Sequence, residues 1–375
     1  MSRVRLEIDL DVLRQNFVRI AERVSPCSVM AVLKANAYGL GTLPIARVLI
    51  EAGAARLGVA DVNEGLDLKD MGVPIHILGA VLPREIAPAI AAGLTLPITD
   101  ADSAALISRE AVAQNTVVRA HALIDSGMGR LGIPIDNAFD VIRHCVALPG
   151  IDLEGLYSHF PMAYHGEDPY TCDQLQRVRD LLNDLASDGI TFAMRHIANS
   201  DAVNNVSDAF AEPFNMVRVG INLYGAFDTR GAQSIALDSV LTLRSELVAA
   251  RTLPAGTRIG YGGTHTLRAE TRVGTVPAGY ADGLPLALSN NGHVLVDGQV
   301  CPVLGRVSMD YTTIDLSAAP NARVGDDVIC IGHMQDEIIR VEDWARIKGT
   351  HSYDIICSIG NRVTRCYTPQ KDATP

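Results

Sequence analysis

Residues 31–41 read Ala31-Val-Leu-Lys-Ala-Asn-Ala-Tyr-Gly-Leu-Gly41, and the stretch places a lysine directly after a short apolar run. Ser28 to Leu33 is predicted to be a buried parallel strand, because it is short and largely apolar. Lys34 would then stand where the strand meets its following loop, the edge at which α/β proteins place reactive groups. Tyr38 and the glycines after it predict a loop whose backbone can approach an anion. On position alone, a structural loop lysine is the commoner explanation.

Eight β-rich runs alternate with helix-length segments between residues 28 and 221. The predicted strands are Ser28 to Lys34, Arg56 to Ala60, Ile75 to Gly79, Leu94 to Ile98, Val117 to Asp125, Leu153 to His159, Met194 to Asn199 and Met216 to Ile221. Helix start signals such as Asp100-Ala-Asp-Ser103 lie between them. Eight βα units in about 200 residues are what a (β/α)8 TIM barrel requires. The fold class is therefore α/β, with this barrel predicted at residues 1–235.

After about residue 235 the sequence pattern changes. Strand-like runs with alternating apolar and polar residues are now separated by Gly, Pro and Asp. Asp297-Gly298 between two strand-like runs is a hairpin signal, and one short helix is expected around Trp344. A mostly β C-terminal domain is therefore predicted at residues 236–375.

Composition excludes several classes of function. The formal charge of −11 and an aromatic share of 5% offer neither a basic face nor stacking platforms, so we expect no nucleic-acid partner. The seven cysteines form no Cys-x-x-Cys pair, which favours reduced thiols in a cytoplasm. The acidic N-terminus does not resemble a signal peptide, and no apolar stretch is long enough for a membrane span. We expect a cytoplasmic protein without a membrane partner.

Four predicted strands end in a polar residue that follows an apolar or β-branched run: Lys34, Asp125, His159 and Asn199. That end is the catalytic face of a (β/α)8 barrel. A core histidine with satisfied hydrogen bonds is the alternative for His159 alone, but four coincidences favour a site. A metal site at His159 and His165 is disfavoured because no further ligands stand nearby, so no metal is expected.

Motifs along the whole chain resemble those of the alanine racemases, fold-type III pyridoxal-phosphate enzymes. Besides the lysine stretch, they are Glu7-Ile-Asp-Leu-Asp11, Asp125-Ser-Gly-Met-Gly-Arg-Leu-Gly132, Ser158-His-Phe160, Ala198-Asn-Ser200, Val217-Arg-Val-Gly-Ile221, Gly260-Tyr-Gly262, Gly279-Tyr-Ala-Asp-Gly283, Gly305-Arg-Val-Ser-Met-Asp310 and Tyr353-Asp-Ile355. They occur in the family's order, which makes the resemblance specific for fold and cofactor.

The resemblance implies that Lys34 forms a Schiff base with pyridoxal 5'-phosphate. It implies that Arg218 faces the pyridine nitrogen and that His159 supports this arginine. The other implied cofactor-binding residues, most of them around the phosphate, are Tyr38, Asn199, Ser200, Gly220, Ile221 and Tyr353.

Racemisation needs a base on each face of the substrate Cα. By resemblance Lys34 serves one face, and Tyr261 serves the other from the second subunit's C-terminal domain. A tyrosine merely packed in the β domain is the alternative for Tyr261. Arg130 and the backbone amide of Met309, also from the partner, would hold the substrate carboxylate. The implied assembly is a homodimer with shared active sites.

One position departs from the family pattern. Most members place a carbamylated lysine seven residues before the arginine that matches Arg130, whereas this chain has Leu123. We hypothesise that an anion such as chloride, a water molecule or another side chain takes over beside Arg130, since an unpaired buried guanidinium is costly.

The expected reaction is interconversion of L- and D-alanine, which supplies D-alanine for peptidoglycan. A racemase of serine or another amino acid, and a non-catalytic pyridoxal-phosphate carrier, remain alternatives. A decarboxylase is less favoured, because Tyr261 and the Gly305–Asp310 block follow the racemase pattern.

Overall fold

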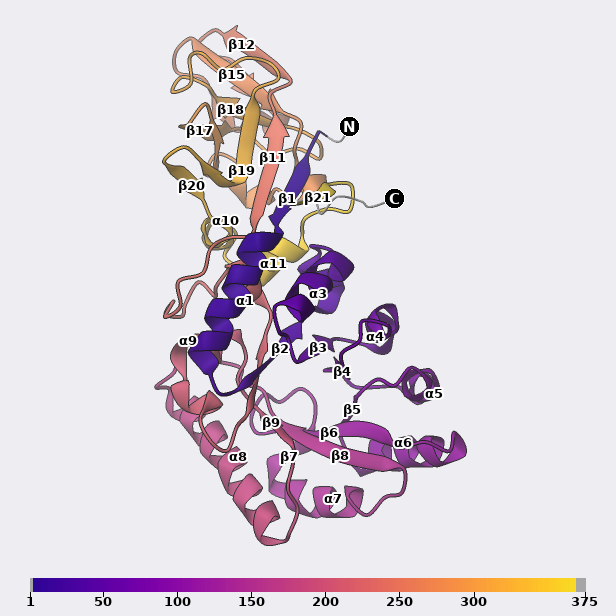
Figure 1. The fold of residues 1–375 in the computed structure, drawn as a ribbon. Helices are drawn as coiled ribbons and strands as arrows, with labels where there is room; N and C mark the ends of the chain where they lie inside the picture. The colour runs from indigo at the N-terminus through magenta and orange to yellow at the C-terminus, as the bar shows by residue number, and fades with distance from the viewer. Residues whose placement is uncertain (1–2, 369–375) are drawn as a thin grey trace.

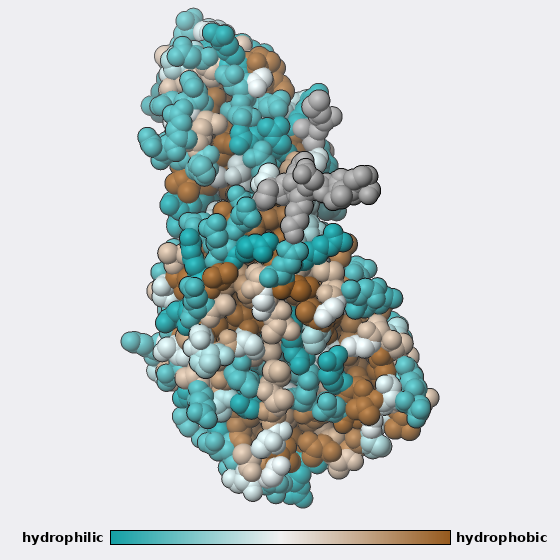
Figure 2. Space-filling view, viewed as in Figure 1, coloured by the Kyte–Doolittle hydropathy of each residue, from teal (hydrophilic) through white to brown (hydrophobic). Residues whose placement is uncertain are grey.

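The computed structural model describes residues 3–368 and has an α/β part followed by a β-rich part (Figure 1). Residues 1–2 and 369–375, at the outer ends of the two predicted domains, lie outside the described residues. On the face seen in Figure 2, the β-rich part presents mainly hydrophilic residues, whereas apolar residues mix in over the α/β part.

All eight predicted barrel strands are confirmed as strands. They are β2 (Ser28–Val32), β3 (Arg56–Val59), β4 (Ile75–Ile77), β5 (Leu96–Ile98), β6 (Val118–Asp125), β8 (Ile151–Tyr157), β9 (Met194–His196) and β10 (Met216–Val219). Several end earlier than predicted, so that Lys34, His159 and Asn199 stand two or three residues beyond their strands. A short strand that was not predicted, β7 (Ile133–Pro134), pairs with β6.

The parallel strands form two sheets, in the orders β10-β2-β3-β4 and β5-β6-β8-β9. Backbone contacts also link the sheets to each other. His76 and Thr95 form a parallel bridge between β4 and the start of β5. At the other side, the amide of Arg218 donates to the Ala198 carbonyl at 3.0 Å, and that of Asn215 donates to the Arg195 carbonyl at 3.0 Å.

Helices join consecutive strands of these sheets. They are α1 (Leu10–Val24), α2 (Lys34–Tyr38), α3 (Thr42–Glu51), α4 (Val62–Leu68), α5 (Pro83–Ala91), α6 (Ala101–Ala113), α7 (Ala138–Cys145), α8 (Pro169–Ser187) and α9 (Ser200–Asn205). The start of α6 follows the predicted signal, because the Asp100 carboxylate accepts a hydrogen bond from the Ser103 amide and so caps the helix. Asp61 caps α4 in the same way, through the Glu64 amide.

The β-rich part is one large sheet with two short helices, α10 (Val341–Lys348) and α11 (Ser352–Cys357). Its strands are β11 (Leu241–Glu246), β12 (Ala249–Leu253), β15 (Thr271–Val276), β16 (His293–Val296), β17 (Gln299–Leu304), β18 (Thr312–Asp315), β19 (Asp327–Met334), β20 (Glu337–Ile339) and β21 (Thr364–Thr368), and β13 (Arg258–Ile259) pairs with β14 (His265–Thr266) apart from it. The predicted hairpin is confirmed: β16 and β17 pair antiparallel around Asp297 and Gly298, both with positive φ. Trp344 lies buried in α10, where the sequence predicts a helix.

The first strand, β1 (Arg5–Asp9), lies in this large sheet although it precedes the α/β part. It pairs antiparallel with β11 and parallel with β21. Glu7 of β1 accepts two hydrogen bonds from Arg244 of β11, at 2.9 and 3.2 Å. From β1 in the β-rich part, the chain therefore enters the α/β part through α1 and returns after β10.

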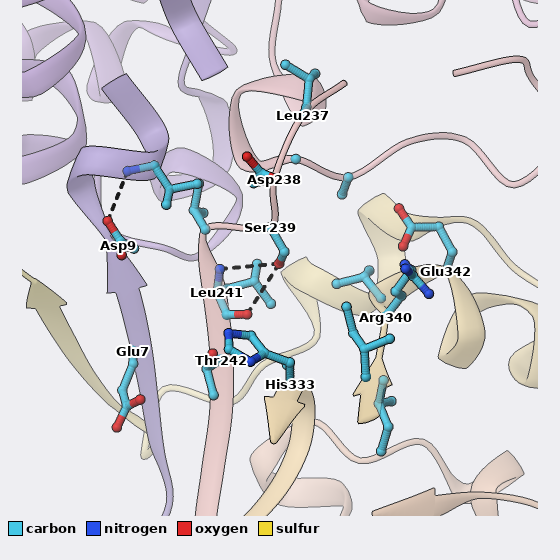
Figure 3. Close-up of a pocket in the computed structure, with 18 of the residues that line it drawn as sticks. Glu7, Asp9, Leu237, Asp238, Ser239, Leu241, Thr242, His333, Arg340 and Glu342 are labelled. Carbon is cyan, nitrogen blue, oxygen red and sulfur yellow. Dashed lines mark hydrogen bonds between the residues drawn. The ribbon is translucent and has the colours of Figure 1, made fainter. Parts of the chain in front are cut away.

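Where β1, β11 and β19 meet the segment 225–242, the protein encloses a cavity of about 500 Å³ (Figure 3). Its lining includes Glu7 and Asp9 of β1, Thr242 of β11 and His333 of β19. None of the predicted site residues lines it. No helix within residues 3–368 is long and apolar enough to cross a membrane.

Candidate active site

A cavity of about 600 Å³ collects most of the predicted site residues beyond the carboxyl ends of the parallel strands. Of those residues, Lys34, Tyr38, Arg130, His159, Asn199, Ser200, Arg218, Gly220 and Tyr353 line it. Ile221 follows Gly220 directly in the chain, whereas Tyr261 and Met309 are not among the lining residues. The cavity is the candidate active site.

The segment directly after Lys34 is a left-handed turn, which precedes the loop that Tyr38 and the following glycines predict. Ala35 to Tyr38 have φ values between 52° and 60°. A left-handed conformation costs an L-residue about 1–2 kcal/mol, so something must hold this turn. Glu64 does so: its carboxylate accepts hydrogen bonds from the Ala35 amide at 2.7 Å and from the Ala60 amide at 2.8 Å. Helix α4 thereby fixes the backbone beside Lys34.

The environment of Lys34 lowers the pKa of its amine. Solvent reaches the side chain through the open mouth of the cavity. Nevertheless the surrounding protein atoms lower its pKa by desolvation, and the positive charge of Arg130 lowers it further. A neutral amine is the form that attacks an aldehyde or accepts a proton.

Hydroxyl groups and a glycine gather at one end of the cavity. The Gly220 amide donates to the Ser200 hydroxyl at 3.1 Å. A Cβ on Gly220 would lie 2.0 Å from the Tyr38 hydroxyl, so that hydroxyl rests directly against the glycine. The rings of Tyr38 and Tyr353 are 5.8 Å apart, and the Ser200 hydroxyl contacts Tyr353. Hydroxyls around a close-packed glycine suit a phosphate group, as the sequence predicts.

Gly220→Ala tests this end of the cavity. The φ of −123° at Gly220 suits any residue, so the effect of a methyl group there is steric. Displacing the Tyr38 hydroxyl should weaken pyridoxal-phosphate binding by about tenfold, since overpacking costs about 1–3 kcal/mol. Equilibrium dialysis of the cofactor-free protein measures this. Unchanged affinity in a folded variant would show that the glycine serves only the backbone.

Arg218 lies buried at the base of the cavity, and its two terminal nitrogens are fully engaged. Nη1 donates to His196 Nδ1 at 2.9 Å, and Nη2 donates to the Ser158 carbonyl at 2.7 Å. His159 Nδ1 also accepts from Nη2, at 3.1 Å. Within residues 3–368 no acceptor is paired with Nε, which leaves that donor for a ligand. Burial lowers the pKa of Arg218 to about 10.

Asn199 lines the cavity and also caps helix α9. Its side-chain oxygen accepts from the Ala202 amide at 3.0 Å and so caps α9, while its amide nitrogen donates to the Phe160 carbonyl at 3.4 Å. The cap orients Ser200, the first residue of the helix. His165, the other histidine of the disfavoured metal site, packs against Tyr164.

Arg130 lines the open side of the cavity. The side chain is exposed at the cavity, and none of its ion pairs or hydrogen bonds involves a carboxylate among residues 3–368. Leu123, which is 6% exposed, lines the same cavity. In the single chain Arg130 lies in the loop after β6, where its guanidinium is open to solvent. No protein carboxylate replaces the carbamate in the described chain.

Tyr261 and Met309 lie on the surface of the β-rich part. The two residues are 71% and 51% exposed, which excludes a tyrosine packed in the β domain. Glycines with positive φ flank Tyr261 on both sides. Both side chains are therefore presented outward.

Sequence reasoning missed several residues of the cavity, among them Tyr157, Asp201 and Asp228. The Tyr157 ring lies 5.4 Å from the Arg218 guanidinium carbon and stacks on His196. Asp201 directly follows Ser200, a predicted site residue, and this neighbouring position was the one sign in the sequence that Asp201 lines the cavity. Burial, and then the charge of Asp228, raise the pKa of Asp201 to about 6.

Asp201→Asn should therefore stabilise the cofactor-free protein at alkaline pH. A raised pKa means that the folded state favours the protonated acid, so the ionised form costs stability once the pH exceeds about 6. Removing that ionisation should raise the free energy of unfolding at pH 8 by about 2–3 kcal/mol. The gain should shrink as the pH falls from 6 towards 4. Urea unfolding at several pH values measures it, and a pH-independent effect would contradict the assignment.

Comparisons with known proteins agree with this arrangement. Residues 8–228 match the model of the alanine racemase N-terminal domain, and residues 240–367 match that of the C-terminal domain. An alanine racemase of Desulforamulus reducens is 38% identical over 96% of this chain and 98% of its own.

Solved structures agree as well. The alanine racemase of Streptomyces lavendulae superposes with a TM-score of 0.90 at 33% identity, covering 98% of this chain and 97% of its own. That of Bartonella henselae, with covalently bound pyridoxal phosphate, has a TM-score of 0.88 at 27% identity, covering 98% and 100%. The family models and the relatives span both parts of the chain, and the chain belongs to the alanine racemase family.

Proposed function

We propose that the protein interconverts L- and D-alanine with pyridoxal 5'-phosphate bound at Lys34. The observation that carries the proposal is a single cavity in which a lysine with a lowered pKa, a buried arginine with one free donor and a hydroxyl-lined glycine stand together. The family supports alanine as substrate. The cofactor in the B. henselae structure supports the assignment of pyridoxal phosphate.

The residues fit that cofactor in three places. Lys34 Nζ is the group that would bond its aldehyde. Arg218 Nε would donate to the ring nitrogen, and Tyr38, Ser200, Tyr353 and the backbone at Gly220 and Ile221 would hold the phosphate. When bound, the cofactor supplies an electron sink for the pair left by breaking the Cα–H bond. Because an arginine stays charged, it donates to an unprotonated ring nitrogen and keeps that sink weak, which limits side reactions.

Two bases complete the proposed mechanism. Lys34 Nζ accepts or returns the Cα proton on one face of the substrate, and the Tyr261 hydroxyl does so on the other. Arg130 and the Met309 amide hold the substrate carboxylate, with a small anion or a water molecule beside Arg130 in place of the family's carbamate. Leu123 leaves an apolar wall at that position.

Tyr261 and Met309 would serve the site of a partner subunit in a homodimer. The homodimer is supported by a set of large apolar residues that are exposed on the β-rich part: Tyr261, Tyr280, Leu286, Met309 and Tyr311. Tyr280 and Met309 lie on neighbouring segments, because the amides of Tyr280 and Ala281 donate to the carbonyls of Ser308 and Met309. A contiguous group of exposed apolar side chains is typical of a protein contact.

We also propose that the eight parallel strands close into a (β/α)8 barrel, supported by the backbone contacts at both seams between the two sheets. The proposed domains are residues 1–235 and 236–375, with β1 reaching across to pair in the second domain. The seven cysteines are free, which suits work in the cytoplasm. D-Alanine made there would supply peptidoglycan synthesis.

A chiral assay over a panel of L-amino acids tests the proposal. We expect D-alanine to form fastest, with equilibrium reached from either enantiomer. Faster conversion of serine or another amino acid would transfer the assignment to that substrate. A protein that binds the cofactor but racemises nothing in the panel would instead be a carrier.

A further inference from the structure

A chain of hydrogen bonds runs from Arg218 through the interior of the α/β part to a buried ion pair. Arg218 Nη1 contacts His196 Nδ1 at 2.9 Å, and His196 Nε2 contacts His121 Nδ1 at 2.9 Å. His121 Nε2 contacts Glu154 Oε1 at 3.1 Å. Arg56 then donates a hydrogen bond to each oxygen of Glu154, at 2.7 and 3.0 Å. The five residues come from five strands: Arg218 from β10, and the others from β9, β6, β8 and β3, which are labelled in Figure 1.

The chemistry of its two ends decides where each proton in this chain lies. A guanidinium can only donate, so His196 Nδ1 must accept and His196 Nε2 must carry the proton. His196 Nε2 therefore donates to His121 Nδ1. By the same reasoning His121 Nε2 carries a proton and donates it to Glu154. Every donor points away from Arg218 and towards the carboxylate.

Burial keeps the imidazoles of His121 and His196 neutral, as this direction of hydrogen bonding requires. His121 is 0% exposed and His196 is 1% exposed. Burial lowers the pKa of both histidines, and the charge of Arg218 contributes in each case. Burial alone would raise the pKa of Glu154, but the hydrogen bonds from His121 and Arg56 outweigh it and lower that pKa to about 2. Glu154 is therefore ionised at neutral pH.

Aromatic neighbours restrict alternative arrangements of the chain. The Tyr157 ring stacks on His196 with centroids 5.0 Å apart and planes 3° apart. His76 packs edge-on against His121 at 4.4 Å and against His196 at 5.8 Å. Both imidazole rings are therefore confined between other rings.

We propose that Glu154 is a positioning residue for the pyridine-binding arginine, acting through the fixed tautomers of His121 and His196. By fixing these tautomers, Glu154 keeps an acceptor opposite Arg218 Nη1, which leaves Nε as the donor to the cofactor. The proposal rests on the role of Arg218 in the proposed function. The carboxylate acts without touching the cofactor or the substrate.

Glu154→Gln is the sharpest change, because it replaces one of the two acceptor oxygens by an amide donor. Glu154 Oε1 accepts from both His121 Nε2 and Arg56 Nη1, whereas Oε2 accepts from Arg56 Nη2. A glutamine amide nitrogen therefore faces either Arg56 Nη2 or the pair Arg56 Nη1 and His121 Nε2. In the second orientation the amide donates to His121 Nε2 and reverses the tautomer of that ring. His121 Nδ1 would then donate to His196, and a proton on His196 Nδ1 would face a donor of Arg218. The last contact of the chain would be lost.

The test begins with the wild-type protein. Nitrogen NMR of ¹⁵N-histidine-labelled protein separates protonated from unprotonated ring nitrogens, and single His121→Asn and His196→Asn variants assign the signals. We expect both rings neutral with the proton on Nε2, with and without pyridoxal phosphate. A proton on His196 Nδ1 in the wild type would overturn the proposal. This result does not depend on racemase activity, so it stands apart from failure of the proposed function.

In Glu154→Gln we expect the His196 signal to change tautomer or to broaden by exchange. The absorbance of bound pyridoxal phosphate should shift, and kcat for alanine should fall by about tenfold or more with KM within about twofold, as for other residues that orient a ligand-binding side chain. Glu7→Gln is the matched control. It also replaces a carboxylate that accepts two hydrogen bonds from one arginine, Arg244, but Glu7 lies in the large sheet and not in the chain that leads to Arg218. A folded Glu154→Gln with the wild-type His196 signal and kcat would overturn the proposal.

Discussion

Lys34→Ala should abolish racemisation, with a fall in rate of about 10⁴-fold or more, the upper range for loss of a single acid–base group. The variant loses both the amine that bonds the cofactor and the base on one face of the substrate. The left-handed turn should survive, because Glu64 holds it through the backbone amides of Ala35 and Ala60. Circular dichroism of D- and L-alanine solutions measures the rate, and mass spectrometry after borohydride treatment locates the covalently held cofactor.

Lys69→Ala is the control, since Lys69 is an exposed lysine at the end of α4. It should keep wild-type activity and a labelled Lys34. A cofactor trapped on another lysine, or an active Lys34→Ala variant, would show that the cavity has been misassigned.

Tyr261→Phe should reduce racemisation by about 10²- to 10⁴-fold, the usual range for one acid–base group. The change removes only a hydroxyl from a side chain that is 71% exposed, so stability and cofactor binding should stay as they are. Solvent-deuterium incorporation at Cα is the more specific measurement. With Lys34 as the remaining base, one enantiomer of alanine should still exchange its Cα proton while the other does not.

The two enantiomers distinguish the possible outcomes for Tyr261. Loss of exchange from both would mean that Tyr261 holds the substrate and is not a base. Unchanged exchange from both would remove it from the mechanism and leave the second base to be found elsewhere.

The sequence predicts the parallel strands and most of the cavity because both depend on local patterns. Short β-branched runs indicate buried strands, and the polar residues that follow them share one end of the sheets. The turn at Ala35 to Tyr38 could not be predicted, because nothing in alanine favours a positive φ and the turn depends on Glu64, which is distant in sequence.

Long-range pairing accounts for the other surprises. The place of β1 in the large sheet depends on partners more than 200 residues away. His121 and Glu154 each look like an ordinary strand residue, and their link to Arg218 exists only once five strands are assembled. The exposure of Arg130 depends on the course of a loop that motif matching cannot supply.

Subunit complementation tests the central claim most directly. Lys34→Ala and Tyr261→Phe chains carrying different tags can be co-expressed, and the mixed dimer purified through both tags. If Lys34 of one subunit and Tyr261 of the other serve the same site, each mixed dimer has one intact site and one doubly altered site. We predict about half of wild-type activity from the mixed dimer, while each variant alone stays nearly inactive. A mixed dimer as inactive as its parents would contradict the account, because each site would then draw both residues from a single chain.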